Sequence, residues 1–189
     1  MKDNFTRNCV VALVVFCVIG AVAYVMVGRR STGGMGTGAA KSAVSSRNLV
    51  ETTVQFYFAD RNTGMLTAEQ RTFTHPEAPV DFAKMIVAGL ISGPEQGGIQ
   101  TLPSETSLRA FYIMKDGTAV ADFTKEMAEK HPGGARTEYL TVMSLIQSLT
   151  MNIPDIKRVT ILIDGKEVET LAGHIDLSQP ITPDMALAR

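Results

Sequence analysis

Thiol groups are almost absent from this sequence of 189 residues, which contains two cysteines and no tryptophan. Both cysteines, Cys9 and Cys17, lie inside one apolar run near the N-terminus. The rest of the chain therefore has no residue for a disulfide, a cysteine-based zinc site or a thiol nucleophile. A domain of about 130 residues buries enough core without disulfides, so the cysteine content leaves the cellular compartment open.

The sequence also lacks a surplus of charge of either sign. Its 18 lysine and arginine residues nearly balance its 19 aspartate and glutamate residues, which gives a formal net charge of −1. Proteins that bind nucleic acid usually carry a basic excess gathered on one face. The charge balance therefore argues against nucleic acid as a partner.

The familiar catalytic motifs are missing as well. The sequence contains no Gly-x-Ser-x-Gly elbow, no Walker phosphate-binding loop and no His-Glu-x-x-His zinc motif. Five aspartates adjoin turn-forming residues or lie at the ends of expected elements, where aspartate is favoured for turn geometry. They are Asp60, Asp116, Asp155, Asp164 and Asp176. The sequence therefore predicts a protein that is not an enzyme and has neither a cofactor nor a metal site.

Only three histidines are present, so any catalytic or metal site would have to use them. His75 lies in a Thr-His-Pro segment, and His131 precedes Pro-Gly-Gly. His174 and Asp176 are two residues apart, a spacing that places both on one face of a strand and that can orient an imidazole. We interpret the pair as a structural hydrogen bond that closes the last hairpin. The alternative is a cell-wall hydrolase or metal-dependent enzyme that uses His174 and Asp176.

A long hydrophobic run follows a short N-terminal tail, residues 1–8. Residues 9–27 contain no charged side chain, and basic residues flank them on both sides. As a helix they would span about 28 Å, close to the hydrocarbon thickness of a bilayer. We interpret the run as a single transmembrane anchor. A signal peptide cleaved after Ala23 is the alternative, because Ala21-Val-Ala23 has the small-x-small pattern of a cleavage site.

Residues 28–49 predict a flexible linker. Residues 31–46 are rich in Gly, Ser, Ala and Thr, and they include Gly34-x-Gly36-x-Gly38. A phosphate-binding loop would need a strand before these glycines and a helix after them, whereas a membrane helix is expected before them. A coil of this length reaches about 20–24 Å, enough to hold a domain clear of the membrane surface.

The remaining sequence, residues 50–184, predicts one folded domain, followed by a short tail of residues 185–189. Alternation of apolar and polar residues predicts a strand over residues 53–58 and a short partner over residues 71–74. Apolar residues at helical spacing predict two helices, bounded by proline, glycine or asparagine. They cover residues 79–92 and 135–151.

Two Asp-Gly dipeptides, Asp116-Gly117 and Asp164-Gly165, each separate a pair of apolar runs. Asp-Gly readily adopts the positive φ angles of a tight turn, so we predict β-hairpins over residues 108–123 and 158–171. The expected fold class is α+β. A mainly antiparallel or mixed sheet built from hairpins carries two packed helices, and one N-terminal transmembrane helix precedes it.

Several segments of this domain resemble the GerMN domain, a family named for its occurrence in sporulation and spore-germination proteins. The resemblance extends over residues 54–184, and its longest segment is Val159-Thr-Ile-Leu-Ile-Asp-Gly-Lys-Glu-Val-Glu-Thr-Leu-Ala-Gly-His-Ile-Asp-Leu-Ser-Gln-Pro-Ile-Thr182. The shorter segments are Val54-Gln-Phe-Tyr-Phe-Ala-Asp60, Leu90-Ile-Ser-Gly-Pro94, Thr101-Leu-Pro103, Lys115-Asp-Gly117 and Val120-Ala-Asp-Phe-Thr124.

The resemblance implies an extracytoplasmic domain of the bacterial envelope that has no established catalytic site and is associated with envelope assembly and protein–protein contacts. This sequence has one copy where the germination proteins often have two, and it has no lipoprotein cysteine. We therefore expect a single-pass protein of the cytoplasmic membrane whose domain lies in the periplasm or on the cell surface. Its expected partner is another envelope protein or peptidoglycan. The residues expected to form its interaction or structural motif are Asp122, Asp164, Gly165, Gly173, His174 and Asp176.

Overall fold

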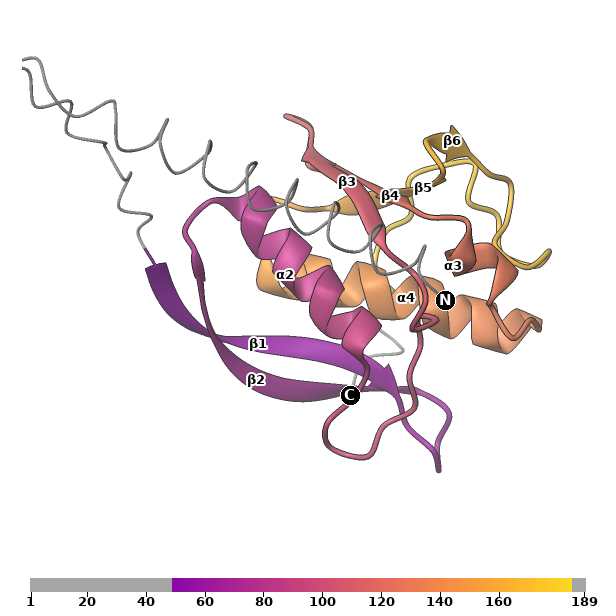
Figure 1. Ribbon diagram of the computed structural model, residues 1–189, viewed down its shortest axis with the longest axis horizontal. Helices are drawn as coiled ribbons and strands as arrows, with labels where there is room; N and C mark the ends of the chain where they lie inside the picture. Colours follow the sequence, from indigo (N-terminus) through magenta and orange to yellow (C-terminus); the bar gives the residue numbers. More distant parts are fainter. Residues whose placement is uncertain (1–48, 185–189) are drawn as a thin grey trace, which may run out of the picture. The chain divides into compact units, whose positions relative to one another are not determined.

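The domain consists of two β-sheets with helices between them (Figure 1). The computed structural model describes residues 49–184. Its elements follow the order β1 (Leu49–Ala59), β2 (Leu66–Pro76), α2 (Pro79–Ser92), β3 (Leu108–Ile113), β4 (Thr118–Phe123), α3 (Glu126–Glu129), α4 (Ala135–Asn152), β5 (Arg158–Ile163) and β6 (Lys166–Glu167).

The expected anchor or signal peptide, residues 9–27, and the N-terminal tail before it lie outside the described residues. The same is true of the linker up to residue 48 and of the C-terminal tail. Among the helices of residues 49–184, none has the length and apolar character needed to cross a membrane.

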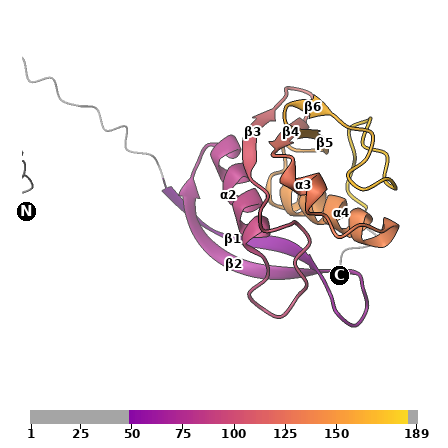
Figure 2. The same ribbon diagram turned by 45° about the vertical axis from the view of Figure 1, so that its right-hand side comes forward.

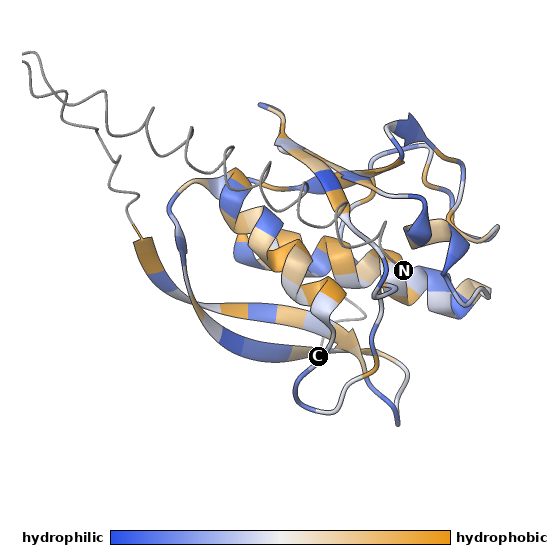
Figure 3. Ribbon diagram, viewed as in Figure 1, coloured by the Kyte–Doolittle hydropathy of each residue, from blue (hydrophilic) through white to orange (hydrophobic). Residues whose placement is uncertain are grey.

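β1 and β2 pair along their whole length as an antiparallel hairpin that forms the first sheet, with Leu49 opposite Pro76 and Ala59 opposite Leu66. Both strands are longer than predicted, because the strands continue through polar positions such as Glu51 and Thr52, where the apolar alternation fades. Figure 3 shows the hydrophilic stretch that runs along β2. Backbone pairing, rather than side-chain burial, sets the length of this hairpin.

The second sheet has the strand order β3-β4-β5-β6 and is mixed. β3 and β4 are antiparallel, as the first Asp-Gly turn predicts, whereas β4 and β5 are parallel. A parallel pair needs a long crossover, and α3 and α4 provide it. The prediction of a single sheet is therefore wrong, because the domain has two sheets. The mixed strand directions and the α+β class are confirmed.

The last hairpin is shorter than predicted. β6 contains only two residues, Lys166 and Glu167, instead of extending to Leu171. The backbone N–H groups of Leu171 and Ala172 donate to a side chain of α4 and not to a neighbouring strand. The chain therefore leaves the sheet after β6 and continues as an irregular segment.

The two long helices match the predicted bounds, and α4 extends one residue further, to Asn152. α2 and α4 lie between the two sheets in both views (Figures 1 and 2). α2 approaches β1 closely at Gly89, where an added Cβ would lie 2.4 Å from the Phe56 ring. The buried core lines both helices and the inner faces of both sheets, with Phe56, Ile86 and Leu149 among its fully buried members.

The polar face of α4 is also buried, because it pairs with the edge of β1. Asn152 accepts from the N–H of Gln55 (2.9 Å) and donates to its carbonyl oxygen (2.8 Å). Ser148 accepts from the N–H of Tyr57, and Ser144 donates to the Tyr57 carbonyl oxygen. Side chains of one helix thus take the place of a third strand beside β1.

Candidate functional site

A fully buried carboxylate on α4, Glu138, is the centre of the candidate site. Its Oε1 accepts from the backbone N–H groups of Leu171 (2.8 Å) and Ala172 (3.0 Å). Its Oε2 lies 2.9 Å from the backbone nitrogen of His174 and 3.1 Å from the Nδ1 of the same residue. One side chain therefore holds the segment of residues 168–177, which we call the C-terminal loop.

The protonation state of Glu138 follows from these contacts. Burial raises the pKa of its carboxyl, but the N–H groups of Ala172 and Leu171 and the imidazole of His174 lower it more, so that the pKa lies below its usual 4.5. The group is thus an ionised acceptor at neutral pH. It follows that Nδ1 of His174 carries the hydrogen of this bond and that Nε2 faces away from Glu138.

The expected pairing of His174 with Asp176 on a strand face is wrong. Neither residue lies in a strand, and the Asp176 carboxylate accepts instead from the N–H (2.9 Å) and hydroxyl (2.6 Å) of Ser178. His174 does make a hydrogen bond, but its partner lies 36 residues away on α4. Within residues 49–184, no group of three His, Cys, Asp or Glu side chains is placed to hold a metal ion.

A second group of predicted residues meets at the β5–β6 turn. Asp122 is nearly buried and accepts from the N–H of Gly165 at 2.8 Å. Arg109 lies between Asp122 (3.3 Å) and Asp164 (3.7 Å). Asp164 and Gly165 both have positive φ angles, 50° and 75°, as a tight Asp-Gly turn requires. Asp122 thus fixes the turn that the sequence predicts.

The six predicted residues therefore form two groups and not one site. Asp122, Asp164 and Gly165 belong to the turn, whereas Gly173, His174 and Asp176 belong to the C-terminal loop. Gly173 has a φ of 95° and donates its N–H to Thr170. Each residue has a structural contact in place, so the geometry assigns both groups to the shaping of surface segments.

Comparison with known proteins places these features in a family. The sequence profile of the Germane family, described as sporulation and spore germination, matches residues 55–169. The chain belongs to this family. The match covers more than half of the chain, and it includes Glu138 and the β5–β6 turn. Gly173, His174 and Asp176 lie beyond its end.

Solved structures of similar sequence support the assignment. The chain is 27% identical to the tandem GerMN domains of the sporulation protein GerM from Bacillus subtilis, with a TM-score of 0.54, 72% of this chain covered and 46% of that one. The chain is 26% identical to the first GerMN domain of the same protein, with a TM-score of 0.53, and the match covers 70% of this chain and 96% of that one. It is also 26% identical to a candidate lipoprotein from Clostridium perfringens, with a TM-score of 0.51, and the match covers 71% of this chain and 87% of that one. No curated protein matches the chain significantly.

The GerMN domain contains a second buried carboxylate, Glu69 on β2, which the sequence analysis missed. Glu69 accepts from the N–H groups of Glu95 (3.0 Å) and Gln96 (2.8 Å) and from Nε of Arg71 (2.7 Å). Burial raises the pKa of Glu69, but these donors lower it by more than burial raises it, so the pKa lies below its usual 4.5. The signal in the sequence was a Glu-x-Arg pair on the inward face of a strand, where charge is rarely left unpaired.

Arg71 completes this arrangement. Its guanidinium donates to the carbonyl oxygen of Gly93 at 2.7 Å and lies over the rings of Phe56 and Phe58, 4.8 and 5.4 Å from their centroids. Glu69 and Arg71 therefore fix the loop that follows α2 onto the first sheet. The loop is held in the same manner as the C-terminal loop, by a buried carboxylate that binds backbone N–H groups.

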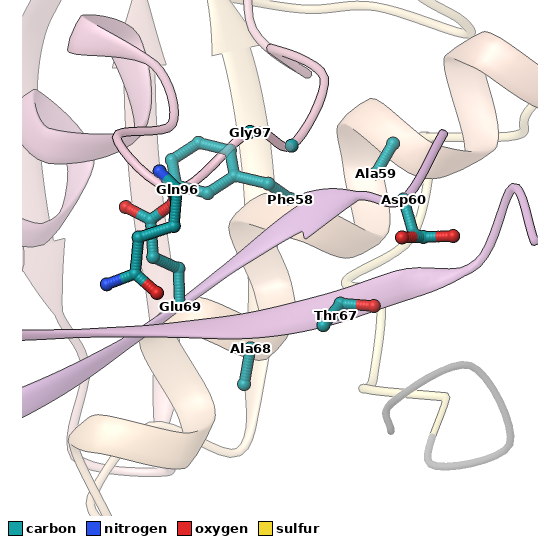
Figure 4. A pocket seen from close by; sticks show the side chains of 9 residues that line it. Phe58, Ala59, Asp60, Thr67, Ala68, Glu69, Gln96 and Gly97 are labelled. Atoms are coloured by element: carbon teal, nitrogen blue, oxygen red, sulfur yellow. Dashed lines mark hydrogen bonds between the residues drawn. The ribbon is translucent and has the colours of Figure 1, made fainter. Parts of the chain in front are cut away.

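A small cavity of 140 Å³ lies between this loop and the β1–β2 hairpin (Figure 4). Glu69 and Gln96 lie next to each other at one end, and Asp60 lies at the other. Asp60 accepts from the N–H groups of Asn62 and Thr63, so it stabilises the hairpin turn. Both carboxylates of the cavity thus already have protein donors.

The turn role predicted for the five aspartates is confirmed. Asp60, Asp164 and Asp176 make the contacts described above, and Asp155 lies in the turn after α4. Asp116 accepts from the N–H and hydroxyl of Thr118 and pairs with Arg158 at 2.7 Å. The Thr118 N–H and the Arg158 guanidinium lower the pKa of Asp116 to about 2.

Proposed function

We propose that this GerMN-domain protein is a non-catalytic interaction module, held on the outer side of a bacterial cytoplasmic membrane, that binds another envelope protein or peptidoglycan. The observation that carries the proposal is the use made of Glu138. A fully buried carboxylate that binds three backbone N–H groups of the C-terminal loop serves to fix the shape of that loop.

A fixed loop favours binding because less conformational entropy is lost when a partner docks. The C-terminal loop is exposed at Gly173, His174 and Asp176, yet its backbone is tied to α4 and to its own side chains. Glu69 gives the loop after α2 the same rigidity from the opposite sheet. Both buried carboxylates therefore support preformed surfaces on one domain.

The location outside the membrane is supported by the sequence and by the relatives. Residues 9–27 have the length and composition of a membrane anchor. One similar structure belongs to a sporulation protein, and another to a candidate lipoprotein. We infer by analogy that the domain lies in the periplasm or on the cell surface.

An enzyme that uses His174 is the second candidate, and one observation favours it. The Glu138 carboxylate orients the imidazole through Nδ1, an arrangement also found where a histidine acts as a base or a metal ligand. Asp176 takes no part, since its carboxylate is bound to Ser178. This candidate predicts a stoichiometric metal in the purified protein that is lost in His174→Ala, or a hydrolytic activity on cell-wall fragments that is lost with it.

Site-specific photocrosslinking in intact cells tests the proposal. A photoreactive residue replaces Glu169, an exposed residue of the C-terminal loop, or Lys84, an exposed residue of α2 that serves as the control. We expect a discrete product from position 169 that contains an envelope protein or shifts on muramidase digestion, and no such product from position 84. Products that contain only cytoplasmic proteins would contradict the proposal, as would equal products from both positions.

A further inference from the structure

A pocket of 220 Å³ lies beside the first two turns of α4, and Glu138 is not among the residues that line it. Three segments meet there, namely the β1–β2 turn, the segment around Ile99 and the first two turns of α4. Arg136 and Leu140 face this pocket, whereas Glu138 is rotated by about 200° from Arg136 around the helix. The pocket and the C-terminal loop are therefore separate surfaces that share one helix.

Two arginines line the pocket, and each joins two of its three segments. Nε of Arg61, in the turn, donates to the carbonyl oxygen of Gly97 at 3.1 Å. Arg136, on α4, donates to the carbonyl oxygens of Thr63 (3.1 Å) and Gly64 (3.0 Å). Both guanidinium groups are thus held in place before any ligand arrives.

Carbonyl oxygens orient these guanidinium groups but do not neutralise them. In residues 49–184, neither Arg61 nor Arg136 forms an ion pair, unlike Arg71, Arg109 and Arg158. The single carboxylate of the lining, Asp60, is engaged by Asn62 and Thr63 within its own turn. The pocket therefore carries an excess of positive charge, which favours an anionic ligand.

Most of the exposed wall is apolar, although Gln100, Thr101, Thr137 and Thr141 also line it. Ile99 is 43% exposed, and Leu140, which also lines the pocket, is half-buried. Pockets for whole drug-sized ligands have volumes of about 300–1,000 Å³. A volume of 220 Å³ suits the end of a chain better than a complete small molecule.

We propose that this pocket binds the terminal carboxylate of a peptide whose last residue is small and apolar, such as alanine. The carboxylate lies between Arg61 and Arg136, because the planar fork of a guanidinium matches two carboxylate oxygens. The terminal side chain packs on Ile99 and Leu140. Two sources share this chemistry, the C-terminus of a protein and the D-alanyl end of a peptidoglycan stem peptide.

This inference deepens the proposed function and rests on it for the class of partner. Fluorescence anisotropy on the full-length protein in detergent tests it with four peptides labelled at their N-termini. The peptides are Lys-L-Ala-L-Ala and Lys-D-Ala-D-Ala, each as the free acid and as the C-terminal amide. We expect saturable binding of at least one acid and at least tenfold weaker binding of its amide. Whichever acid binds more tightly identifies the source.

The variants follow from the geometry. Arg61→Gln removes one guanidinium from an exposed turn, and we expect it to weaken binding of the acid peptide by at least tenfold. Arg136→Lys keeps the charge but loses the fork, and a similar loss is expected, with the melting temperature measured to verify folding. Lys84→Gln removes the same unit charge from α2 and should leave the affinity unchanged.

Three results would overturn the inference. They are no saturable binding of either acid, equal binding of acid and amide, and equal weakening by Arg61→Gln and Lys84→Gln. Each leaves the proposed function standing, because the crosslinks from position 169 report on the C-terminal loop, none of whose residues lines the pocket. If those crosslinks fail while the acid peptide still binds, the proposed function is contradicted and the peptide-binding pocket stands.

Discussion

At the scale of single residues, Glu138 holds the C-terminal loop through four contacts, three with backbone N–H groups and one with the His174 imidazole. Glu138→Ala leaves the buried N–H group of Leu171 and the partly buried N–H groups of Ala172 and His174 without their acceptor, so we expect the free energy of unfolding to fall by about 2 kcal/mol. His174→Ala removes one partly exposed hydrogen bond and should cost about 0.5–1.5 kcal/mol. Urea titration of both variants measures the difference, with Glu169→Ala of the same loop as the control. An equal cost for Glu138→Ala and His174→Ala would contradict this account of the loop.

The pH dependence of the same contact has a defined sign. The pKa of Glu138 is lowered in the folded protein, so its carboxylate stabilises the fold above about pH 4.5, and this contribution is lost as the pH falls further. The stability difference between the wild type and Glu138→Gln should therefore shrink below pH 4.5. Glu69 and Asp116 titrate in the same direction in both proteins and cancel in the difference.

No local pattern reveals the role of Glu138, because its partners lie more than 30 residues further along the chain. A glutamate in the first turn of a helix is normally read as a solvent-exposed group that complements the helix dipole. The prediction that His174 is hydrogen-bonded is confirmed, but the sequence indicated Asp176, two residues away, as its partner. Local chemistry such as the Asp-Gly turns is predictable, whereas contacts between distant segments are not.

At the scale of elements, the helices were predictable and the sheets were not. Apolar spacing together with proline, glycine and asparagine signals gave the bounds of α2 and α4 to within one residue. The β3–β4 hairpin also follows from its turn. The parallel pairing of β4 with β5 joins strands 40 residues apart, and no turn signal encodes it. The burial of the polar face of α4 was likewise hidden, since serine and threonine at these positions resemble a solvated face.

That polar face leads to a prediction about the β1 edge. The Asn152 amide presents an acceptor and a donor to Gln55, much as a neighbouring strand would. Asn152→Ala leaves both backbone groups of Gln55 unpaired, and we expect a loss of about 1–3 kcal/mol. Thr150 lies on the same turn but bonds only within its own helix, so Thr150→Ala should stay within about 0.5 kcal/mol. Thermal unfolding of both variants measures the comparison, and equal effects would show that the edge contact adds nothing to stability.

At the scale of the whole molecule, the N-terminal sequence predicts a membrane topology with which the fold is compatible. The domain of residues 49–184 places two long helices between two sheets, and its carboxylates fix loops on both sides of that core. Such an arrangement needs no disulfide, which suits a sequence without cysteine beyond residue 17. The residues before it contain one apolar run and a linker rich in glycine and serine. A single anchor followed by a tether therefore remains the expectation for residues 9–48.

Protease protection tests this topology. If residues 9–27 anchor the chain with the domain outside, protease added to intact spheroplasts should remove the domain while a cytoplasmic marker survives. Cleavage should begin in the glycine-rich linker, because exposed segments with small residues are cut far faster than paired strands. The first product is therefore a fragment that begins shortly before Leu49, where β1 starts. Charge-neutral replacement of both Lys41 and Arg47, the two trypsin sites between residue 31 and Leu49, provides the control, since with trypsin it should remove this cut and leave other proteases unaffected. Survival of the whole chain until lysis would reverse the orientation, and release of the domain without added protease would favour cleavage after Ala23.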